Sequence, residues 1–306
     1  MKNILVVNYS QTGQLNDILN NITQPLQHHT IEVIRVSPRE NFPFPWTGEA
    51  FFNAMPETVL EEPIELSPIL FKRDKYDLVI FGYQPWFLSP SLPATSILKN
   101  KSFAKVIKGT PVITVIGARN MWLNAQESVK TLIHESGGKL VANIPLIDRN
   151  NNLVSALTIM HWMFGGEKTK KWGMLPKPGI IQEDIDSSCD FGEIINVSID
   201  ENEYHTLQEK ILELDRIIIN TNILFIEERA KKLFKIWANL IKSKGLTTKK
   251  RKFWVTFFKY YLIFALFVVS PIVLFVFNIL VKPFIMNSLQ RKKDYFCSVN
   301  LNTKNA

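Results

Sequence analysis

The sequence predicts an α/β protein with a doubly wound five-stranded parallel sheet, a C-terminal helical extension and a membrane-embedding hydrophobic helix. Three observations predict this. Short apolar runs alternate with helical patterns in the first half of the chain, helical periodicity dominates the second half, and an uncharged stretch lies near the end. The 306 residues are 46% hydrophobic and 21% charged, which is typical of folded protein and excludes a wholly disordered or collagen-like chain.

Five runs have the composition of strands that are buried on both faces of a sheet. They are residues 3–9, 31–36, 77–82, 110–117 and 139–147. Helical spacing appears at residues 15–22, 91–98 and 123–135, between these runs. Residues 38–70, rich in proline and aromatic side chains, are expected to form a longer excursion between the second and third strands. Such alternation predicts parallel strands joined by crossover helices.

The segments beyond the fifth strand differ in composition. Residues 152–180 are a Trp- and Met-rich appendage, and residues 203–219 return to a helical pattern. The acidic residues 183–201 are expected to be an irregular connection. Residues 222–244 predict a basic amphipathic helix that ends at Gly245. This helix is expected either to lie on anionic lipid or to pack on the body with a solvated basic face.

Charge divides the chain into an acidic body and a basic tail. Residues 1–225 hold 20 Lys and Arg against 25 Asp and Glu, whereas residues 226–306 hold 16 against 3. This asymmetry favours a membrane surface or a polyanion as partner of the tail. A nucleic-acid partner is not expected, because the tail contains an apolar span.

Residues 260–281 form that span. Sixteen of the 22 residues are Leu, Ile, Val or Phe, so insertion into a bilayer gains about 5–10 kcal/mol. The length is about 33 Å as a helix, enough to cross a membrane core of roughly 30 Å. The first expectation is a span kinked at Ser270-Pro271 that anchors the C-terminus at the cytoplasmic face of the inner membrane. Basic residues at both ends keep a second interpretation open, a re-entrant or in-plane hairpin, and a buried core helix is the third.

The cysteine count limits other classes of protein. Cys189 and Cys297 are too few for a disulfide framework or a four-cysteine zinc site, and no metal is expected. The short apolar N-terminus has no signal-peptide cleavage site, so the body is expected to be cytoplasmic.

The loop after the first strand predicts an anion site. It presents hydroxyl groups and a glycine at the amino end of a helix, where backbone amides and the helix dipole attract a phosphate group. No nucleotide-triphosphate or dinucleotide motif is present, so a monophosphate is favoured. The alternative is a helix whose Ser and Thr only cap its first turn. The predicted binding residues are Ser10, Gln11, Thr12, Gly13, Gln14 and Leu15.

Two further loops leave the carboxyl ends of predicted strands. They bring aromatic and Met side chains to the edge of the sheet where ligands bind in this class of fold. Aromatic faces suit a flat heterocycle, although a hydrophobic clamp against the sheet would use the same residues. The residues predicted to contact the cofactor here are Gln84, Pro85, Trp86, Phe87, Gly117, Ala118 and Asn120.

These loops resemble those of the flavodoxin-like FMN proteins, including the NAD(P)H:quinone reductases. On the family pattern T/S-x-T-G-x-T, Ser10, Thr12 and Gly13 match, while Leu15 replaces the last hydroxyl. The resemblance covers roughly residues 1–150. It implies FMN as the cofactor, with the phosphate group on the first loop.

A closer resemblance covers more of the chain. The segments NYSQTGQLNDIL, YQPWFLSPSLPA and MHWMFGG, with the hydrophobic C-terminus, resemble the dialkylresorcinol condensing enzyme family (DarA type) of pigment pathways. The resemblance implies a flavin-dependent aromatase. A ketosynthase partner would supply a lipophilic 2,5-dialkylcyclohexane-1,3-dione, which this protein would oxidise to the dialkylresorcinol.

This chemistry assigns roles to further residues. A base must take a proton beside a carbonyl while the flavin accepts a hydride, and His161 is the candidate base. Tyr83 and Arg119 are expected to polarise a carbonyl. The expected substrate pocket comprises Trp122, Met160, Trp162 and Met163, although such residues at helical spacing also serve as plain packing. Two other functions remain open: an NAD(P)H:quinone reductase or related FMN-dependent reductase, and a flavin-free membrane scaffold.

The expected division of the chain follows from these assignments. A homodimer is possible, and lipid contact is expected through residues 221–293. The segments are residues 1–150 (flavodoxin-like FMN-binding domain), 151–220 (substrate pocket and helices), 221–259 (basic amphipathic helix and linker), 260–281 (membrane helix) and 282–306 (basic tail).

Overall fold

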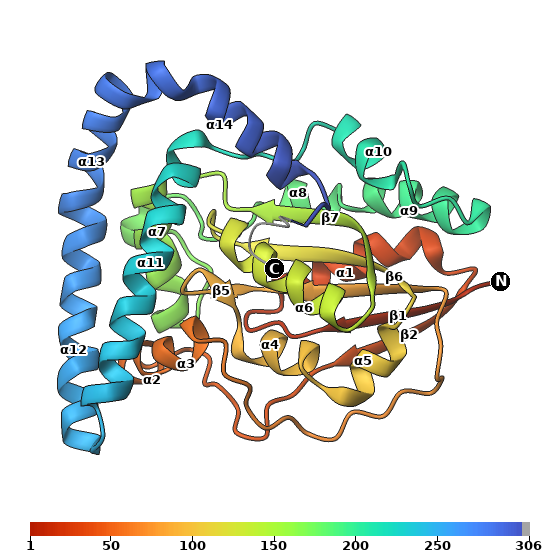
Figure 1. The fold of residues 1–306 in the computed structure, drawn as a ribbon, viewed down its shortest axis with the longest axis horizontal. Coiled ribbons are helices and arrows are strands. Elements are labelled where there is room, and N and C mark those ends of the chain that lie inside the picture. The colour runs from red at the N-terminus through yellow and green to blue at the C-terminus, as the bar shows by residue number, and fades with distance from the viewer. Residues whose placement is uncertain (302–306) are drawn as a thin grey trace.

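The computed structural model describes residues 1–301 and contains the predicted five-stranded parallel sheet (Figure 1). The strand order is β2-β1-β3-β6-β7, and every neighbouring pair is parallel. The strands are β1 (Asn3–Asn8), β2 (Thr30–Arg35), β3 (Leu78–Tyr83), β6 (Pro111–Ala118) and β7 (Lys139–Ile147). A short antiparallel ribbon of β4 (Pro85–Trp86) and β5 (Ser89–Pro90) follows β3.

Helices cover both faces of the sheet. Side chains alternate along β1, so that Ile4 and Val6 face one helical layer while Leu5 and Val7 face the other. The first layer holds α1, α9 and α10, and the second holds α4, α5 and α6. The helices up to residue 213 are α1 (Gln14–Thr23), α2 (Gly48–Asn53), α3 (Met55–Val59), α4 (Leu92–Leu98), α5 (Lys101–Ile107), α6 (Leu123–Glu135), α7 (Asn152–Gly165), α8 (Gln182–Asp186), α9 (Cys189–Glu201) and α10 (Leu207–Glu213), with 3-10 turns η1 (Gln24–Leu26) and η2 (Lys171–Gly173).

The expectation of an irregular connection at residues 183–201 is wrong, because this segment forms α8 and α9. Phe191, Ile195 and Ile199 recur at four-residue intervals and are buried in the cluster beneath α1. Gly192 allows α9 to approach closely, since a Cβ there would lie 2.1 Å from the carbonyl oxygen of Ile22. Burial of this apolar face therefore outweighs the acidic composition of the segment.

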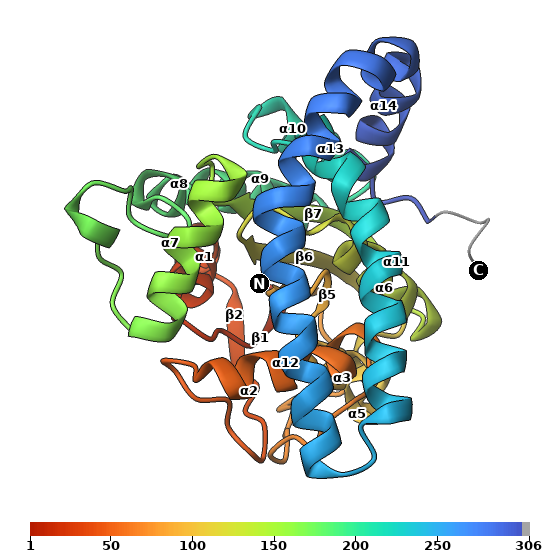
Figure 2. The ribbon, with the colours of Figure 1, turned by 90° about the vertical axis from the view of Figure 1, so that its left-hand side faces the viewer.

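The C-terminal extension is a helical hairpin followed by a return. The amphipathic helix α11 (Thr221–Lys244) is capped by the Asn220 side chain and ends before Gly245, as predicted. An apolar helix then runs back beside it (Figure 2). It comprises α12 (Thr248–Phe264), the π-helical turn η3 (Ala265–Val269), α13 (Ser270–Val276), the π-helical turn η4 (Phe277–Val281) and α14 (Lys282–Cys297).

This apolar helix is long and apolar enough to cross a membrane. The interpretation as a core helix is excluded, because only 6% of its most apolar window is buried. The predicted kink at Ser270-Pro271 is also wrong, since the helix passes through that position with α-helical dihedral angles. The bend lies at Val281, just before Pro283, where φ is −114°, and it turns α14 back over the body (Figure 1).

Candidate functional site

The candidate site lies where the strand order reverses, between β1 and β3. The loops that leave these strands contact each other, because the amide of Gln11 donates to Oε1 of Gln84 at 3.0 Å. A cavity of about 240 Å³ opens at this edge. Residues from these two loops line it together with residues from the β6 loop, the excursion, α7 and the segment before α8. Ligands of doubly wound sheets bind at this position.

One end of the cavity meets the amino end of α1. Gly13 occupies the N-cap with φ of 88°, and no side chain caps the first turn. Ser10 Oγ accepts a hydrogen bond from the Gly13 amide at 3.1 Å, and the Thr12 hydroxyl has no partner within residues 1–301. A Cβ on Gly13 would meet nothing within 4 Å. The loop therefore offers donors beside open space, as an anion site requires.

Two predicted binding residues use their side chains within the protein. Gln11 Nε2 donates to the carbonyl oxygen of Pro43 at 3.1 Å. Gln14 Nε2 donates to the carbonyl oxygen of Ile180 at 2.8 Å, and Lys168 Nζ donates to the same oxygen at 3.1 Å. Both glutamines line the cavity, but their amides hold neighbouring segments in place. Lys168, which sequence reasoning missed, adds a cation beside the loop.

The opposite wall is aromatic. Trp86 contacts Tyr9, Phe42 and Trp46 edge to face, with ring centroids 5.0 to 6.0 Å apart. Gln84, Pro85, Trp86 and Phe87, which are predicted to contact the cofactor, line the cavity. Trp46 and Phe51, from the excursion, line it too. The aromatic richness of residues 38–70 was the available signal for them, but no periodicity connected it to this edge.

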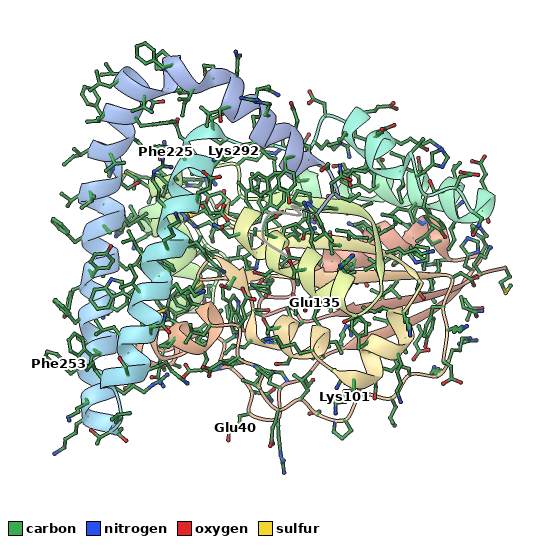
Figure 3. The ribbon with its side chains drawn as sticks, in the orientation of Figure 1. Glu40, Lys101, Glu135, Phe225, Phe253 and Lys292 are labelled. Atoms are coloured by element: carbon green, nitrogen blue, oxygen red, sulfur yellow. The ribbon has the colours of Figure 1, made fainter. Side chains whose placement is uncertain are left out.

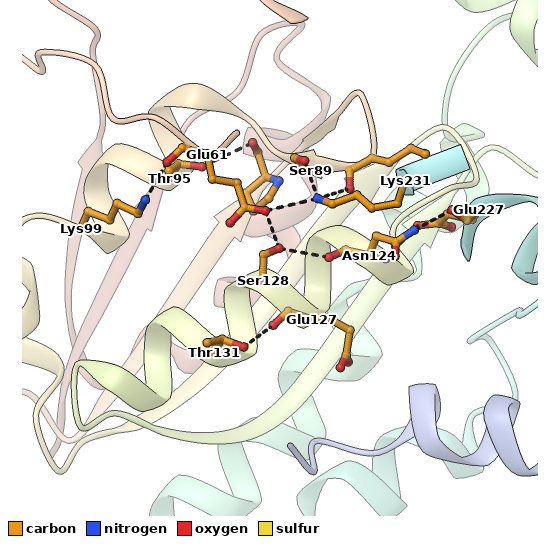
Figure 4. Close-up of polar contacts among 12 residues, drawn as sticks. Glu61, Ser89, Thr95, Lys99, Asn124, Glu127, Ser128, Thr131, Glu227 and Lys231 are labelled. Carbon is orange, nitrogen blue, oxygen red and sulfur yellow. Dashed lines mark hydrogen bonds and ion pairs between the residues drawn. The ribbon is translucent and has the colours of Figure 1, made fainter. Parts of the chain in front are cut away.

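The loop after β3 is strained and is held by α11 (Figure 4). Phe87 and Leu88 have φ of 47° and 63°, a region that costs residues other than glycine about 1–3 kcal/mol each. Lys231 Nζ donates to the Leu88 carbonyl oxygen at 3.2 Å and to Ser89 Oγ at 2.6 Å, and pairs with Glu61 at 3.2 Å. The sequence places Lys231 on the basic face of an amphipathic helix, whereas the structure makes it part of the site's support.

Arg119 brings a positive charge to the cavity beside Gly117 and Ala118. Its Nη1 donates to the carbonyl oxygen and to Oδ1 of Asn152, each at 3.0 Å. Within residues 1–301 no carboxylate lies within 4.0 Å of the guanidinium. Burial lowers the pKa of Arg119 to about 10, so the group is charged at neutral pH. Such a cation is suited to an anionic ligand.

Asn120 differs from its predicted position. It lines a second cavity of about 390 Å³, between the loop after β7 and α13, and not the one beside Arg119. Its Nδ2 donates to Asn152 Oδ1 at 3.0 Å. Arg119 and Asn120 therefore share Asn152 Oδ1 as an acceptor, while Arg119 lines the first cavity and Asn120 the second.

Helix α7 gives the cavity its remaining apolar wall. Met160, Trp162 and Met163, which are predicted to form the substrate pocket, line the cavity together with Ile159. His161 does not, since it lies on another face of the helix, with Nε2 3.2 Å from Thr169 Oγ1 at the surface. The assignment of His161 as the base is therefore wrong in its geometry.

Tyr83 and Trp122 also lie outside the cavity. The Tyr83 side chain is fully buried, and its hydroxyl donates to Gln126 Oε1 at 2.8 Å. Burial raises the pKa of Tyr83 well above its ordinary value. Trp122 is 1% exposed and packs in the core beneath α6. Tyr83 is therefore not placed to polarise a carbonyl in the cavity, and Trp122 does not line it.

The strand order and the site at its reversal define the class: a flavodoxin-like α/β protein. No protein-family model matches the chain, and no curated protein does. The dialkylresorcinol resemblance therefore stays a prediction.

Solved structures match in part. A Lactobacillus acidophilus flavoprotein in complex with FMN has 13% identity and a TM-score of 0.38, covering 47% of this chain and 93% of that one. The oxidised flavodoxin 1 of Bacillus cereus has 14% identity and a TM-score of 0.32, covering 62% and 95%. The fold assignment rests on the strand order and pairing.

Proposed function

We propose that this protein is an FMN-dependent oxidoreductase that acts on a lipophilic cyclic ketone at a membrane. The observation that carries the proposal is the composition of one cavity. Three features meet at the reversal point of the sheet: a helix end without a side-chain cap, an aromatic wall, and an arginine that has no carboxylate partner among residues 1–301. The helix end suits a phosphate group, the aromatic wall suits a flat ring, and the arginine suits a negative charge that develops during the reaction.

The residues present fit FMN. The amides around Gly13, with the hydroxyls of Ser10 and Thr12, would hold the phosphate group. Trp86 and Gln84 lie where the flat ring system would meet the loop after β3. Bound FMN would supply a two-electron acceptor that takes a hydride from the substrate. The protein's own contribution is binding, orientation and charge.

The proposed substrate is a 2,5-dialkylcyclohexane-1,3-dione, which loses two hydrogens to become a dialkylresorcinol. One leaves as a proton beside a carbonyl and the other as a hydride from the neighbouring carbon. Arg119 would hold the negative charge on the ring oxygen after the proton beside the carbonyl leaves. Met160, Trp162 and Met163 would contact the alkyl chains.

One observation favours a second function, reduction of a quinone by NAD(P)H. Among the described residues that line the cavity there is no Asp, Glu, His or Lys. The lining of the cavity thus offers no side-chain carboxylate, imidazole or amine that could act as a base. Dehydrogenation of a dione requires a base, whereas hydride transfer to a quinone depends less on one. The two functions share the cofactor and differ in the direction of electron flow.

The test uses the full chain in detergent micelles, saturated with FMN under anaerobic conditions. Addition of a dialkylcyclohexanedione is expected to bleach the flavin absorption and to yield a product two hydrogens lighter by mass spectrometry. Bleaching by NADPH but not by the dione would instead support the reductase. A flavin that responds to neither compound contradicts both proposals.

The proposal includes membrane association. The helix Thr248–Cys297 is the apolar element, and the basic residues that flank it would contact anionic lipid at the cytoplasmic face. Long-chain diones partition into membranes, because each buried CH₂ contributes about 0.8 kcal/mol. An enzyme held on the membrane meets such a substrate where it accumulates.

A further inference from the structure

The apolar helix carries a continuous exposed stripe. The stripe comprises Phe253, Phe257, Tyr260, Phe264, Val268, Ile272, Phe275 and Ile279. Each member is between 43% and 68% exposed, and the spacing of three or four residues places all of them on one side of the helix. An exposed apolar surface of this extent on a soluble protein marks an interaction site.

The other side of the helix packs on the body. Phe258 is fully buried among Phe52, Phe87 and Phe234. Farther along, Phe277 is 1% exposed and stacks on Phe225 of α11 with ring centroids 3.7 Å apart. These contacts hold the helix lengthwise against the body, with the stripe facing outward. In Figure 3, Phe253 points away from the body at the start of the helix.

The first end of the helix is fixed to the body by polar contacts. Arg251 Nη2 pairs with Glu57 Oε2 at 2.7 Å, and its Nε donates to Asn53 Oδ1 at 2.6 Å. Arg251 is the cation closest to the Glu57 carboxylate, whose pKa is lowered below its usual value. If Arg251 moved away from this position, the carboxylate would lose that partner. The start of the apolar helix is therefore not free to turn away from α2 and α3.

The far end of the helix returns to α11 and α6. Lys292 Nζ pairs with Glu228 Oε1 at 2.6 Å, and the Tyr295 hydroxyl donates to Glu127 Oε2 at 2.6 Å. At the bend, Lys282 Nζ lies 3.5 Å from Asn222 Oδ1, at the start of α11. From Arg251 to Val281 the helix is about 46 Å long, at ~1.5 Å per residue. A helix perpendicular to a bilayer would carry Lys282 across a core of roughly 30 Å and break every one of these contacts.

The charges agree with this geometry. Lys249, Lys250 and Lys252 are exposed at the start of the helix, and Arg291 is exposed beyond the bend. Basic residues are retained on the cytoplasmic side of a membrane. A span would place either the lysines at the start of the helix or Arg291 on the opposite side. Both groups lie on the cytoplasmic side if the helix does not cross.

We propose that the apolar helix lies in the plane of one leaflet of an anionic lipid bilayer, with the stripe buried in the acyl boundary and both ends on the cytoplasmic side. The occupant of the exposed face is lipid. The inference rests on the membrane association proposed above and not on the flavin chemistry. It replaces the kinked span by a monotopic arrangement, in which one face of the helix stays on the body.

The test measures the sidedness of single cysteines in the full chain. Cys189 and Cys297 are first replaced by serine, and Leu246→Cys, Asn300→Cys or Val268→Cys is then introduced. Sealed inverted and right-side-out membrane vesicles are treated with a membrane-impermeant maleimide. Leu246 precedes the apolar helix and is 80% exposed, Asn300 follows it, and Val268 belongs to the stripe.

The inference predicts that Leu246→Cys and Asn300→Cys are both labelled in inverted vesicles and both protected in right-side-out vesicles. Val268→Cys should react in neither until detergent is added. Labelling of the two flanking positions from opposite sides would establish a span and overturn the inference. Labelling of Val268→Cys in a chain that washes off the membrane as a dimer would identify a second copy as the occupant, and overturns it too.

The flavin absorption of the same vesicles separates the two proposals. Loss of bound FMN in a correctly inserted chain counts against the proposed function alone. Retained FMN in a chain that spans the bilayer counts against the in-plane helix alone.

Discussion

Lys231 gives the sharpest test of how the C-terminal extension supports the site. Its ammonium group joins Glu61 to the strained residues after β3, and its pKa is lowered mainly by burial. Substitution Lys231→Met removes one ion pair and two hydrogen bonds from a site where the lysine side chain is 22% exposed. Hydrogen bonds to charged groups contribute about 1.5–3 kcal/mol. After discounting for the remaining exposure, we expect the free energy of unfolding to fall by about 2–4 kcal/mol.

The same substitution should also weaken FMN binding, because Phe87 and Leu88 lose the contact that holds their positive φ angles. A loss of about tenfold in affinity, or ~1.4 kcal/mol, is expected. In micelles, unfolding in urea measures the loss of stability, and quenching of FMN fluorescence measures the loss of FMN affinity. Lys235→Met is the matched control, since Lys235 is exposed on the same helix and should change stability by less than about 0.5 kcal/mol. Equal stability and equal FMN affinity in the Lys231→Met and Lys235→Met variants would refute the supporting role.

Three further predictions concern the cavity and a buried acid. Thr12→Ala combined with Gly13→Val should weaken FMN binding by about 10–100-fold with far-UV circular dichroism unchanged, because a donor is lost and φ of 88° strains valine; unaltered affinity would falsify the loop assignment. Arg119→Met should lower kcat/KM for the dione by roughly 100-fold while the FMN Kd changes less than about threefold, and equal losses in both would make Arg119 a cofactor ligand only. Burial raises the pKa of Glu227 to about 7, so the folded chain keeps a proton that the unfolded chain loses. The free energy of unfolding should therefore fall by about 3 kcal/mol as pH rises from about 4.5 to about 7. Urea unfolding of the Glu227→Gln variant should show no such dependence on pH.

The sheet could be predicted because each strand is short, apolar and bounded by polar turns. Burial on both faces selects such sequences, and the alternation with helices leaves few topologies. The same reasoning located the loops after β1, β3 and β6, since the carboxyl ends of parallel strands share one edge. It failed at α9, where charge dominates the composition although Phe191, Ile195 and Ile199 form one buried face.

Side-chain direction was the main source of error at the site. His161 sits between Met160 and Trp162 in sequence, yet a helix turns about 100° per residue and places it at the surface. Tyr83 and Trp122 flank the correct loops but point into the core beneath them. Lys231 and Trp46 were out of reach for a different reason, because only tertiary packing brings α11 and the excursion to this edge.

The bend before Pro283 shows the same limit in the apolar helix. Sequence placed the kink at Pro271, where a π-helical turn accommodates the ring and the helix continues. Contacts of α14 with α6 and α11, which no local pattern encodes, accompany the return of the chain.

Titration of the purified full chain with FMN tests the central claim most directly. We expect saturable binding of one FMN per chain, with fluorescence quenching, and at least about a tenfold loss of affinity in the Thr12→Ala, Gly13→Val variant. A folded, colourless protein that leaves FMN fluorescence unchanged at every concentration would contradict the account.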